Sequence, residues 1–182
     1  LGSGEAFASL RAPVPVPVIR LEGLTGMPIR ELTVLTASIT ADQEVTAVSF
    51  ALGDQPGVSL SAPPYSVAID PAIFQPGDLP LTIAATDADG DSGFLTVTVP
   101  IAALPPTLTF TPDPASLGAI AQPVTFTFTP GGQTAIAELS VSIDGAEPIL
   151  LSEPYTFSVN PLQFSPGAHT LRVRVVNTGG ME

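Results

Sequence analysis

Apolar and polar residues alternate along most of this chain with a period of two. In the first half, Leu35, Ala37 and Ile39 alternate with threonine and serine. Successive side chains of a β-strand point to opposite faces, so this pattern predicts strands with one buried and one exposed face. Similar segments lie at 48–52, 65–69, 81–85 and 95–99, with an opening strand near 16–21 and a short one at 58–60. About seven short strands separated by turns predict an immunoglobulin-like (Ig-like) β-sandwich.

The chain also repeats itself at an offset of 90 residues without a gap. Pro64-Tyr65 recurs as Pro154-Tyr155, and Pro76-Gly77 recurs as Pro166-Gly167. This period is too long for a solenoid unit and suits a small all-β domain. Alternating segments of the second copy lie at 124–129, 139–143, 155–159 and 171–175. We therefore expect an all-β chain of two Ig-like β-sandwich domains in tandem.

The repeat also sets the expected domain boundaries. We expect a first domain over 14–102, a proline-rich linker over 103–106 and a second domain over 107–182. Pro105 and Pro106 stiffen the linker, which predicts a semi-rigid connection between the domains. Residues 1–13 form a lead-in, either a short helix or the tail of a preceding domain.

The two copies differ at their ends. The first copy ends with a strand at 94–99, whereas the second reaches Gly180-Met181-Glu182 before any equivalent segment. A sandwich that lacks its final strand exposes unpaired backbone groups along one edge. We expect either that the second domain is cut short in this chain or that a partner chain pairs with its edge.

The charge balance limits the classes of partner. The chain has 17 acidic residues and five basic ones, all arginine, and its net charge is -12. Such a surface repels polyphosphate, so we expect no nucleic-acid partner and no attraction to anionic membranes. No apolar run reaches the 18–20 or so residues that span a bilayer, so no membrane insertion is expected. The chain has no cysteine, which excludes disulfides and thiolate metal sites.

Several motifs together resemble the bacterial Ig-like (Big-type) domain over residues 16–180. They are Val48-Ser49-Phe50, Ala62-Pro63-Pro64-Tyr65-Ser66, Pro76-Gly77 and the segment 84–90, with second-copy matches at 153–156 and 167–171. The second copy departs at its last turn, where Asn177-Thr178-Gly179-Gly180 replaces the acidic run. The resemblance implies spacer, stalk or adhesive modules of secreted or surface proteins. It also implies an extracellular or cell-surface location, although no signal segment is visible at the N-terminus.

The acidic turn is the strongest candidate for chemistry. Asp87, Asp89 and Asp91 alternate around Gly90, and carboxylates that converge in this way can bind Ca²⁺. The EF-hand pattern fails, because Ser92 stands at the sixth position and no glutamate stands at the twelfth. The alternative is a polar turn in which aspartate and glycine satisfy the backbone. No other cofactor is expected.

Few other residues indicate chemistry. His169 is the only histidine, so neither a nitrogen-ligated metal site nor a catalytic triad is favoured. Tyr65 and Tyr155 occupy equivalent positions, which favours a structural role over a sugar-stacking one. We therefore expect no enzyme activity.

The expected function is a non-catalytic spacer or adhesive module pair of a bacterial surface or secreted protein. The alternative is an accessory module of a secreted enzyme that binds a protein or a carbohydrate. The absence of tryptophan argues against a sugar-stacking surface. The partner, whether protein or glycan, stays open.

Overall fold

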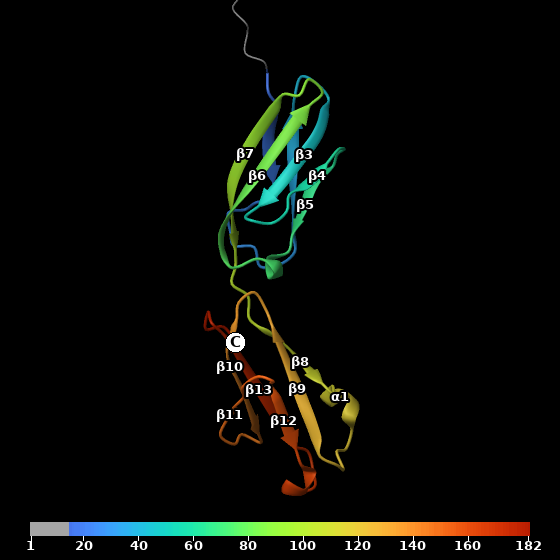
Figure 1. The fold of residues 1–182 in the computed structure, drawn as a ribbon, viewed down its shortest axis with the longest axis vertical. Helices are drawn as coiled ribbons and strands as arrows, with labels where there is room; N and C mark the ends of the chain where they lie inside the picture. Colours follow the sequence, from blue (N-terminus) through green and yellow to red (C-terminus); the bar gives the residue numbers. More distant parts are fainter. Residues whose placement is uncertain (1–14) are drawn as a thin grey trace, which may run out of the picture. The chain divides into compact units, whose positions relative to one another are not determined.

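The computed structural model describes residues 15–182, which are mostly β-strand (Figure 1). The first strands are β1 (Val18–Glu22), β2 (Thr33–Thr40), β3 (Val45–Leu52), β4 (Val58–Leu60), β5 (Tyr65–Ile69), β6 (Gly77–Asp87) and β7 (Ser92–Ile101). The remaining strands are β8 (Thr107–Thr111), β9 (Val124–Gly131), β10 (Ile136–Ile143), β11 (Ile149–Leu150), β12 (Thr156–Val159) and β13 (Leu171–Asn177). One short helix, α1 (Pro114–Leu117), and two 3₁₀ turns, at Pro71–Ile73 and Pro161–Gln163, complete the fold.

The chain divides into two compact units. Unit 1 contains the described residues up to Met27 together with Leu32–Ile69 and Asp78–Pro100. Unit 2 contains Pro28–Glu31, Asp70–Gly77 and Ile101–Glu182. The boundaries expected from the repeat stay a prediction, and the helix expected within 1–13 lies outside the described residues.

Unit 1 is built from two antiparallel sheets. Their strand orders are β1-β2-β5 and β4-β3-β6-β7. In the first sheet Leu35 lies opposite Val67, and in the second Phe50 lies opposite Ile83. Leu35, Val48, Leu81, Ile83 and Val99 have no exposed surface, so both sheets contribute to one dry interior.

Unit 2 has the same plan with one strand fewer among the described residues. Its sheets have the orders β12-β9-β8 and β11-β10-β13. Four residues form its buried centre, Phe126, Phe128, Leu139 and Val141. Phe110 meets Phe128 edge-on, with ring centroids 5.5 Å apart, a geometry that aromatic pairs prefer. An Ig-like β-sandwich fold is thus confirmed.

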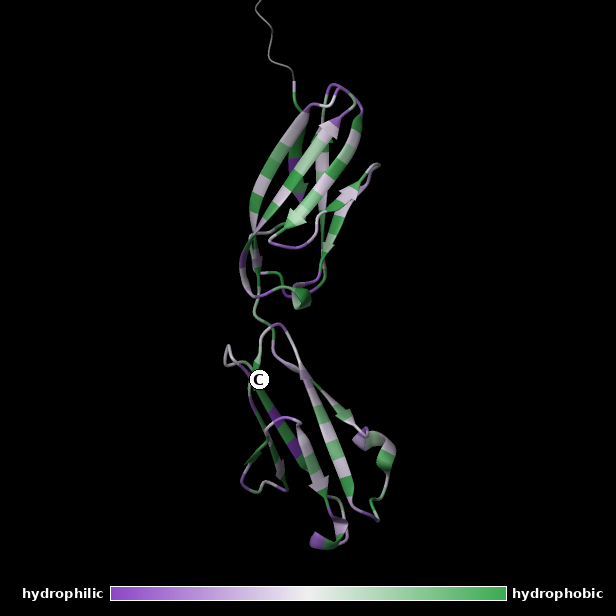
Figure 2. Cartoon of the chain, in the orientation of Figure 1, coloured by the Kyte–Doolittle hydropathy of each residue, from purple (hydrophilic) through white to green (hydrophobic). Residues whose placement is uncertain are grey.

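The alternation of the sequence explains most of these strands. Figure 2 shows hydrophobic and hydrophilic residues in turn along the longer strands. On β6 the buried residues are Leu81, Ile83, Ala85 and Asp87, each two positions from the next. The alternation pattern did not predict β8, β11 or α1. Leu108 and Phe110 of β8 do alternate with threonine, but the segment is short and follows two prolines.

The two 3₁₀ turns show how closely the copies agree. Asp70 accepts a hydrogen bond at Oδ1 from the Ala72 backbone N–H (3.0 Å), and Asn160 accepts one from the Leu162 N–H (3.1 Å). Each turn begins with a proline directly after this cap. Proline suits that position because its fixed φ is helical and its missing N–H would be unpaired there. The repeat therefore extends to local hydrogen bonds.

Candidate functional site

The acidic turn connects β6 to β7 and is organised around Asp87. Asp87 as a whole residue is 4% exposed. Oδ1 accepts hydrogen bonds from the backbone N–H groups of Asp89 (3.1 Å) and Asp91 (3.0 Å). The Asp87 N–H donates to the Asp91 carbonyl at 3.0 Å, and Gly90 takes a positive φ of 86°. Asp87 therefore closes the turn by satisfying backbone donors that would otherwise be unpaired.

The turn after β13 makes the same bonds with an uncharged side chain. Asn177 Oδ1 accepts from the N–H groups of Gly179 and Met181, both at 3.0 Å. The Asn177 N–H donates to the Met181 carbonyl at 3.0 Å, and Gly180 has a φ of 77°. The sequences of the two turns differ, but their hydrogen bonds do not. What they share is an acceptor oxygen, so closing the turn does not need the negative charge of Asp87.

The calcium assignment to Asp87, Asp89 and Asp91 stays a prediction. Among residues 15–182, no group of three or more histidine, cysteine, aspartate or glutamate side chains is arranged to hold a metal ion. The oxygen of Asp87 that faces the turn already accepts two N–H groups, and these reduce its capacity as a ligand. Asp89 is exposed.

His169 forms the most distinct cluster of titratable groups. Its Nδ1 lies 2.6 Å from Asp144 Oδ2, and its Nε2 lies 2.7 Å from the Ser165 carbonyl oxygen. The ring also packs near Phe164, with centroids 5.1 Å apart. With an acceptor at each nitrogen, the protonated imidazolium is favoured, since only this form donates from both.

The pKa values of this pair follow from these contacts. The Ser165 carbonyl and, after it, the Asp144 carboxylate raise the pKa of His169 above 6.5. The pKa of Asp144 is lowered, first by the Thr170 N–H, which donates to Oδ1 at 2.8 Å, and then by His169. A general base needs a free lone pair, whereas acceptors at both ring nitrogens favour the protonated ring. The cluster therefore suits a structural role, in which contacts between His169 and Asp144 link two loops.

The two tyrosines lie within the sandwich walls. Tyr155 is half-buried and packs against the unit 2 core, and its carbonyl accepts from the Phe128 N–H at 2.8 Å. It also borders an open hollow of about 560 Å³, together with Phe128, Glu153 and Pro154. Tyr65 is half-buried at the start of β5. These positions agree with the structural role that the repeat suggests.

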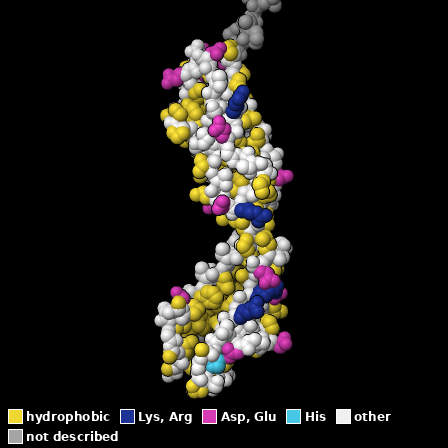
Figure 3. Space-filling model, turned by 180° about the vertical axis from the view of Figure 1, so that it is seen from behind, with side chains coloured by type: hydrophobic (Ala, Val, Ile, Leu, Met, Phe, Trp, Pro, Cys, Tyr) yellow, Lys and Arg dark blue, Asp and Glu magenta, His cyan; other side chains and the backbone are white. Residues whose placement is uncertain are grey.

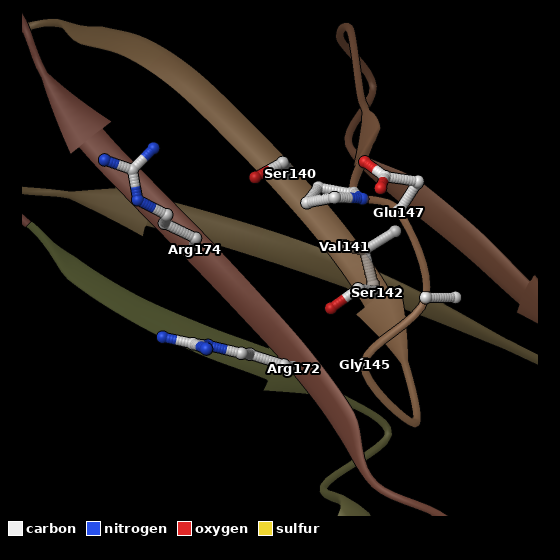
Figure 4. A pocket seen from close by; sticks show the side chains of 9 residues that line it. Ser140, Val141, Ser142, Gly145, Glu147, Arg172 and Arg174 are labelled. Atoms are coloured by element: carbon white, nitrogen blue, oxygen red, sulfur yellow. The ribbon is translucent and has the colours of Figure 1, made fainter.

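A pocket of about 320 Å³ lies on the outer face of the β10–β13 pair (Figure 4). Ser140 and Ser142 of β10, Glu147 of the following loop, and Arg172 and Arg174 of β13 border it. Arg174 forms ion pairs with Glu138 (3.2 Å) and Glu182 (2.7 Å). In Figure 4 both arginine side chains extend away from Ser142 and Glu147, so the charged groups do not converge on one point. Arg172 and Arg174 are both exposed.

Sequence reasoning did not identify the partner of His169 or the equivalence of the two last turns. Asp144 lies 25 residues from His169 in sequence, and only the fold brings them together. For the turns a signal existed, since Asn177 stands 90 residues after Asp87 and both side chains carry an acceptor oxygen.

Comparisons with known proteins give matches in structure only. No family model and no curated protein matches the sequence. Fibronectin(III)-like modules of Clostridium thermocellum CbhA match with 19% identity and a TM-score of 0.39, covering 90% of this chain and 88% of theirs. The PKD1 domain of the Vibrio cholerae metalloprotease PrtV matches with 16% identity and a TM-score of 0.35, covering 50% of this chain and all of its own. The finer resemblance to the Big-type family stays a prediction. In the part of the chain that the structure describes, no helix is long and apolar enough to cross a bilayer.

Proposed function

We propose that the chain is a pair of non-catalytic β-sandwich modules that act as a spacer or adhesive element of a secreted or cell-surface bacterial protein. The observation that carries this proposal is the pair of equivalent turns at Asp87 and Asn177. The residue with the strongest chemical signal in the sequence has a neutral counterpart that makes the same bonds. Turn closure therefore accounts for the hydrogen bonds of Asp87 without a role for its charge.

Two further observations support a scaffold role. Both ring nitrogens of His169 are engaged by acceptors, which favours its protonated form over a base. The 3₁₀ turns at Pro71–Ile73 and Pro161–Gln163 repeat the same aspartate or asparagine cap. Features that recur in both copies are explained by the fold they share.

The test uses the protein to which these modules belong. We expect replacement of residues 15–182 by an unrelated pair of β-sandwich domains of equal length to preserve both the surface display and the activity of that protein. Deletion without replacement should reduce display or reach and leave turnover unchanged. Loss of binding to a target after the replacement, with display intact, would assign recognition to these modules and contradict a spacer role.

A binding role is the second candidate, and the pocket beside Arg172 favours it. In a chain of net charge -12, two of the five basic residues border one pocket together with two serines. The exposed guanidinium of Arg172 suits a ligand that carries a carboxylate. A glycan array that includes acidic sugars tests this, with Arg172→Ala as the matched variant. Binding by the native chain that the variant loses would support the role, and an array without signal would exclude such sugars.

A further inference from the structure

The pocket on the outer face of the β10–β13 pair contains a buried polar group without a partner. Ser140 is only 3% exposed, yet it borders this pocket of about 320 Å³. Within residues 15–182 its hydroxyl takes part in no hydrogen bond. In Figure 4 the hydroxyls of Ser140 and Ser142 both point from β10 toward β13. Because a buried hydroxyl without a partner costs free energy, a ligand group that pairs with Ser140 removes this cost.

The two arginines of β13 lie in register with these serines but differ in their partners. Arg174 lies opposite Ser140, and Arg172 lies opposite Ser142. The guanidinium of Arg174 is engaged by two glutamates, at 3.2 Å and 2.7 Å. Arg172 is exposed and forms no ion pair among the described residues. Arg172 is therefore the group that remains free for a ligand carboxylate, which guanidinium binds with two parallel hydrogen bonds.

A carboxylate of the chain borders the same pocket on another side. Glu147 lies in the loop between β10 and β11, is exposed, and forms no ion pair in the part of the chain that the structure describes. A carboxylate accepts hydrogen bonds from ligand hydroxyls and repels a second anionic group. Because β10 lies between β11 and β13, the serine hydroxyls separate Glu147 from Arg172. The pocket therefore has a cationic side, a hydroxyl centre and an anionic side.

The charged groups of this pocket are not repeated in unit 1. At the offset of 90 residues, Thr82 and Ala84 of β6 stand where β13 has Arg172 and Arg174. Figure 3 shows basic side chains gathered on one face of the unit that carries the histidine, with acidic side chains beside them. Because unit 1 forms the same kind of sandwich without these arginines, the fold itself does not require them.

We propose that the pocket binds one uronic-acid residue, a sugar that carries a single carboxylate and several hydroxyls. Arg172 binds the carboxylate, Ser140 pairs with a ring hydroxyl, and Glu147 accepts hydrogen bonds from further hydroxyls. This assignment rests on the binding role given above as the second candidate, and it adds the class of sugar and the residues that determine specificity.

Other classes of ligand match the pocket less completely. A neutral sugar leaves Arg172 without a partner, and an acidic peptide side chain has no hydroxyl for Ser140 or Glu147. A phosphorylated sugar carries more negative charge, which Glu147 and the net charge of -12 repel. The volume of 320 Å³ lies at the lower end of the range for small-molecule sites, about 300–1,000 Å³, and suits a single sugar residue.

The experiment titrates the whole chain with D-glucuronate and with D-galacturonate and follows the backbone amide and arginine side-chain signals by NMR. We expect at least one of the two sugars to shift the signals of β10, of the loop at 145–147 and of Arg172 to saturation. Glucose should leave these signals unchanged. Acetate and glucose 6-phosphate should each bind at least about tenfold more weakly than the uronic acid, a difference of about 1.4 kcal/mol.

Two variants separate the roles of the residues. Arg172→Thr introduces the residue that unit 1 carries at the equivalent position, and it should abolish saturable binding of the uronic acid. Ser140→Ala should weaken binding of the uronic acid at least about tenfold and leave the weak response to acetate unchanged, because acetate has no hydroxyl to lose. Unchanged signals from the unit 2 core around Phe126 and Phe128 show that each variant is folded.

Three results would overturn the proposal. If neither uronic acid gives a saturable shift, the class of ligand is wrong, and the spacer role stands because it depends on display and reach. Equal responses to acetate and to the uronic acid would mean that the pocket binds any carboxylate. Binding that survives Arg172→Thr would place the sugar elsewhere. A glycan-array signal that Arg172→Ala removes, without any response to a uronic acid, would keep the binding role and reject this ligand.

Discussion

Asp87 and Asn177 each accept hydrogen bonds at Oδ1 from two backbone N–H groups in equivalent turns of the two units, with N···O distances of 3.0–3.1 Å. At this position an acceptor oxygen is needed and a charge is not. The acidic spacing of the sequence predicts a calcium site, and spacing alone does not show that Asp87 Oδ1 accepts two backbone N–H groups.

This comparison predicts the effects of two substitutions. Asp87→Asn should change the free energy of unfolding by less than about 1 kcal/mol, because the amide oxygen can accept both bonds. Asp87→Ala should cost about 1–3 kcal/mol, because it leaves two N–H groups without their acceptor. Urea denaturation in the presence of a chelator measures both values.

A calcium site would give a different result. Calcium at about 100 times its dissociation constant would stabilise the native chain by about 2.7 kcal/mol. If that gain appeared in the native chain and Asp87→Asn removed it, the turn would be a metal site.

The His169–Asp144 pair predicts a pH dependence. Because the pKa of His169 is raised above 6.5, its contribution to stability is complete below 6.5 and is lost as the pH rises through the raised value. Because the pKa of Asp144 is lowered below 3.8, its contribution is present above 3.8 and is lost as the pH falls through the lowered value. The pair should therefore stabilise unit 2 most between pH 3.8 and 6.5.

An NMR titration of the single histidine measures this directly. The His169 ring should titrate above 6.5 in the native chain and closer to 6.5 in Asp144→Asn. Asparagine tolerates the left-handed backbone at this position, where φ is 51°. It also keeps an oxygen for the Thr170 N–H, so the loop is preserved. An unchanged titration in the variant would show that Asp144 does not raise this pKa.

At the scale of elements, β6 and β13 have similar sequence patterns but different surroundings. Both alternate inward aliphatic residues with outward ones, yet within residues 15–182 only β6 is paired on both sides. Burial of the inward side chains depends on the neighbouring strand as well as on the strand itself.

Truncation of the equivalent leucines should reveal this difference. Leu81→Ala should cost about 2–5 kcal/mol, the range for a fully buried leucine. Leu171→Ala should cost only about 1–2 kcal/mol, because its side chain is already partly exposed before the change. Urea titrations followed by NMR signals from each unit measure both values. Equal losses in the free energy of unfolding would show that Leu171 is as fully buried as Leu81.

At the scale of the whole molecule, the two units differ in how completely their interiors are closed. In unit 1 several side chains of both sheets have no exposed surface, whereas unit 2 centres on four buried residues. A smaller dry core gives less apolar stabilisation, so unit 2 should open more readily.

Hydrogen exchange in the native chain tests this ranking. We expect the slowest amides of β10 to exchange at least about tenfold faster than those of the equivalent strand β3, a difference of about 1.4 kcal/mol in opening free energy. Both strands are central in their sheets, so the comparison is matched. Equal protection would mean that the unpaired edge of β13 does not weaken unit 2.

The class of fold follows from the sequence, because period-two alternation gives each strand one apolar face and the ungapped repeat sets the length of each domain. Tertiary structure alone decided the pairing of His169 with Asp144, which needs contact between distant loops, and the half-exposure of Leu171 and Val173. It also showed that Asp87 and Asn177 are equivalent, since hydrogen-bond geometry rather than residue charge defines their role.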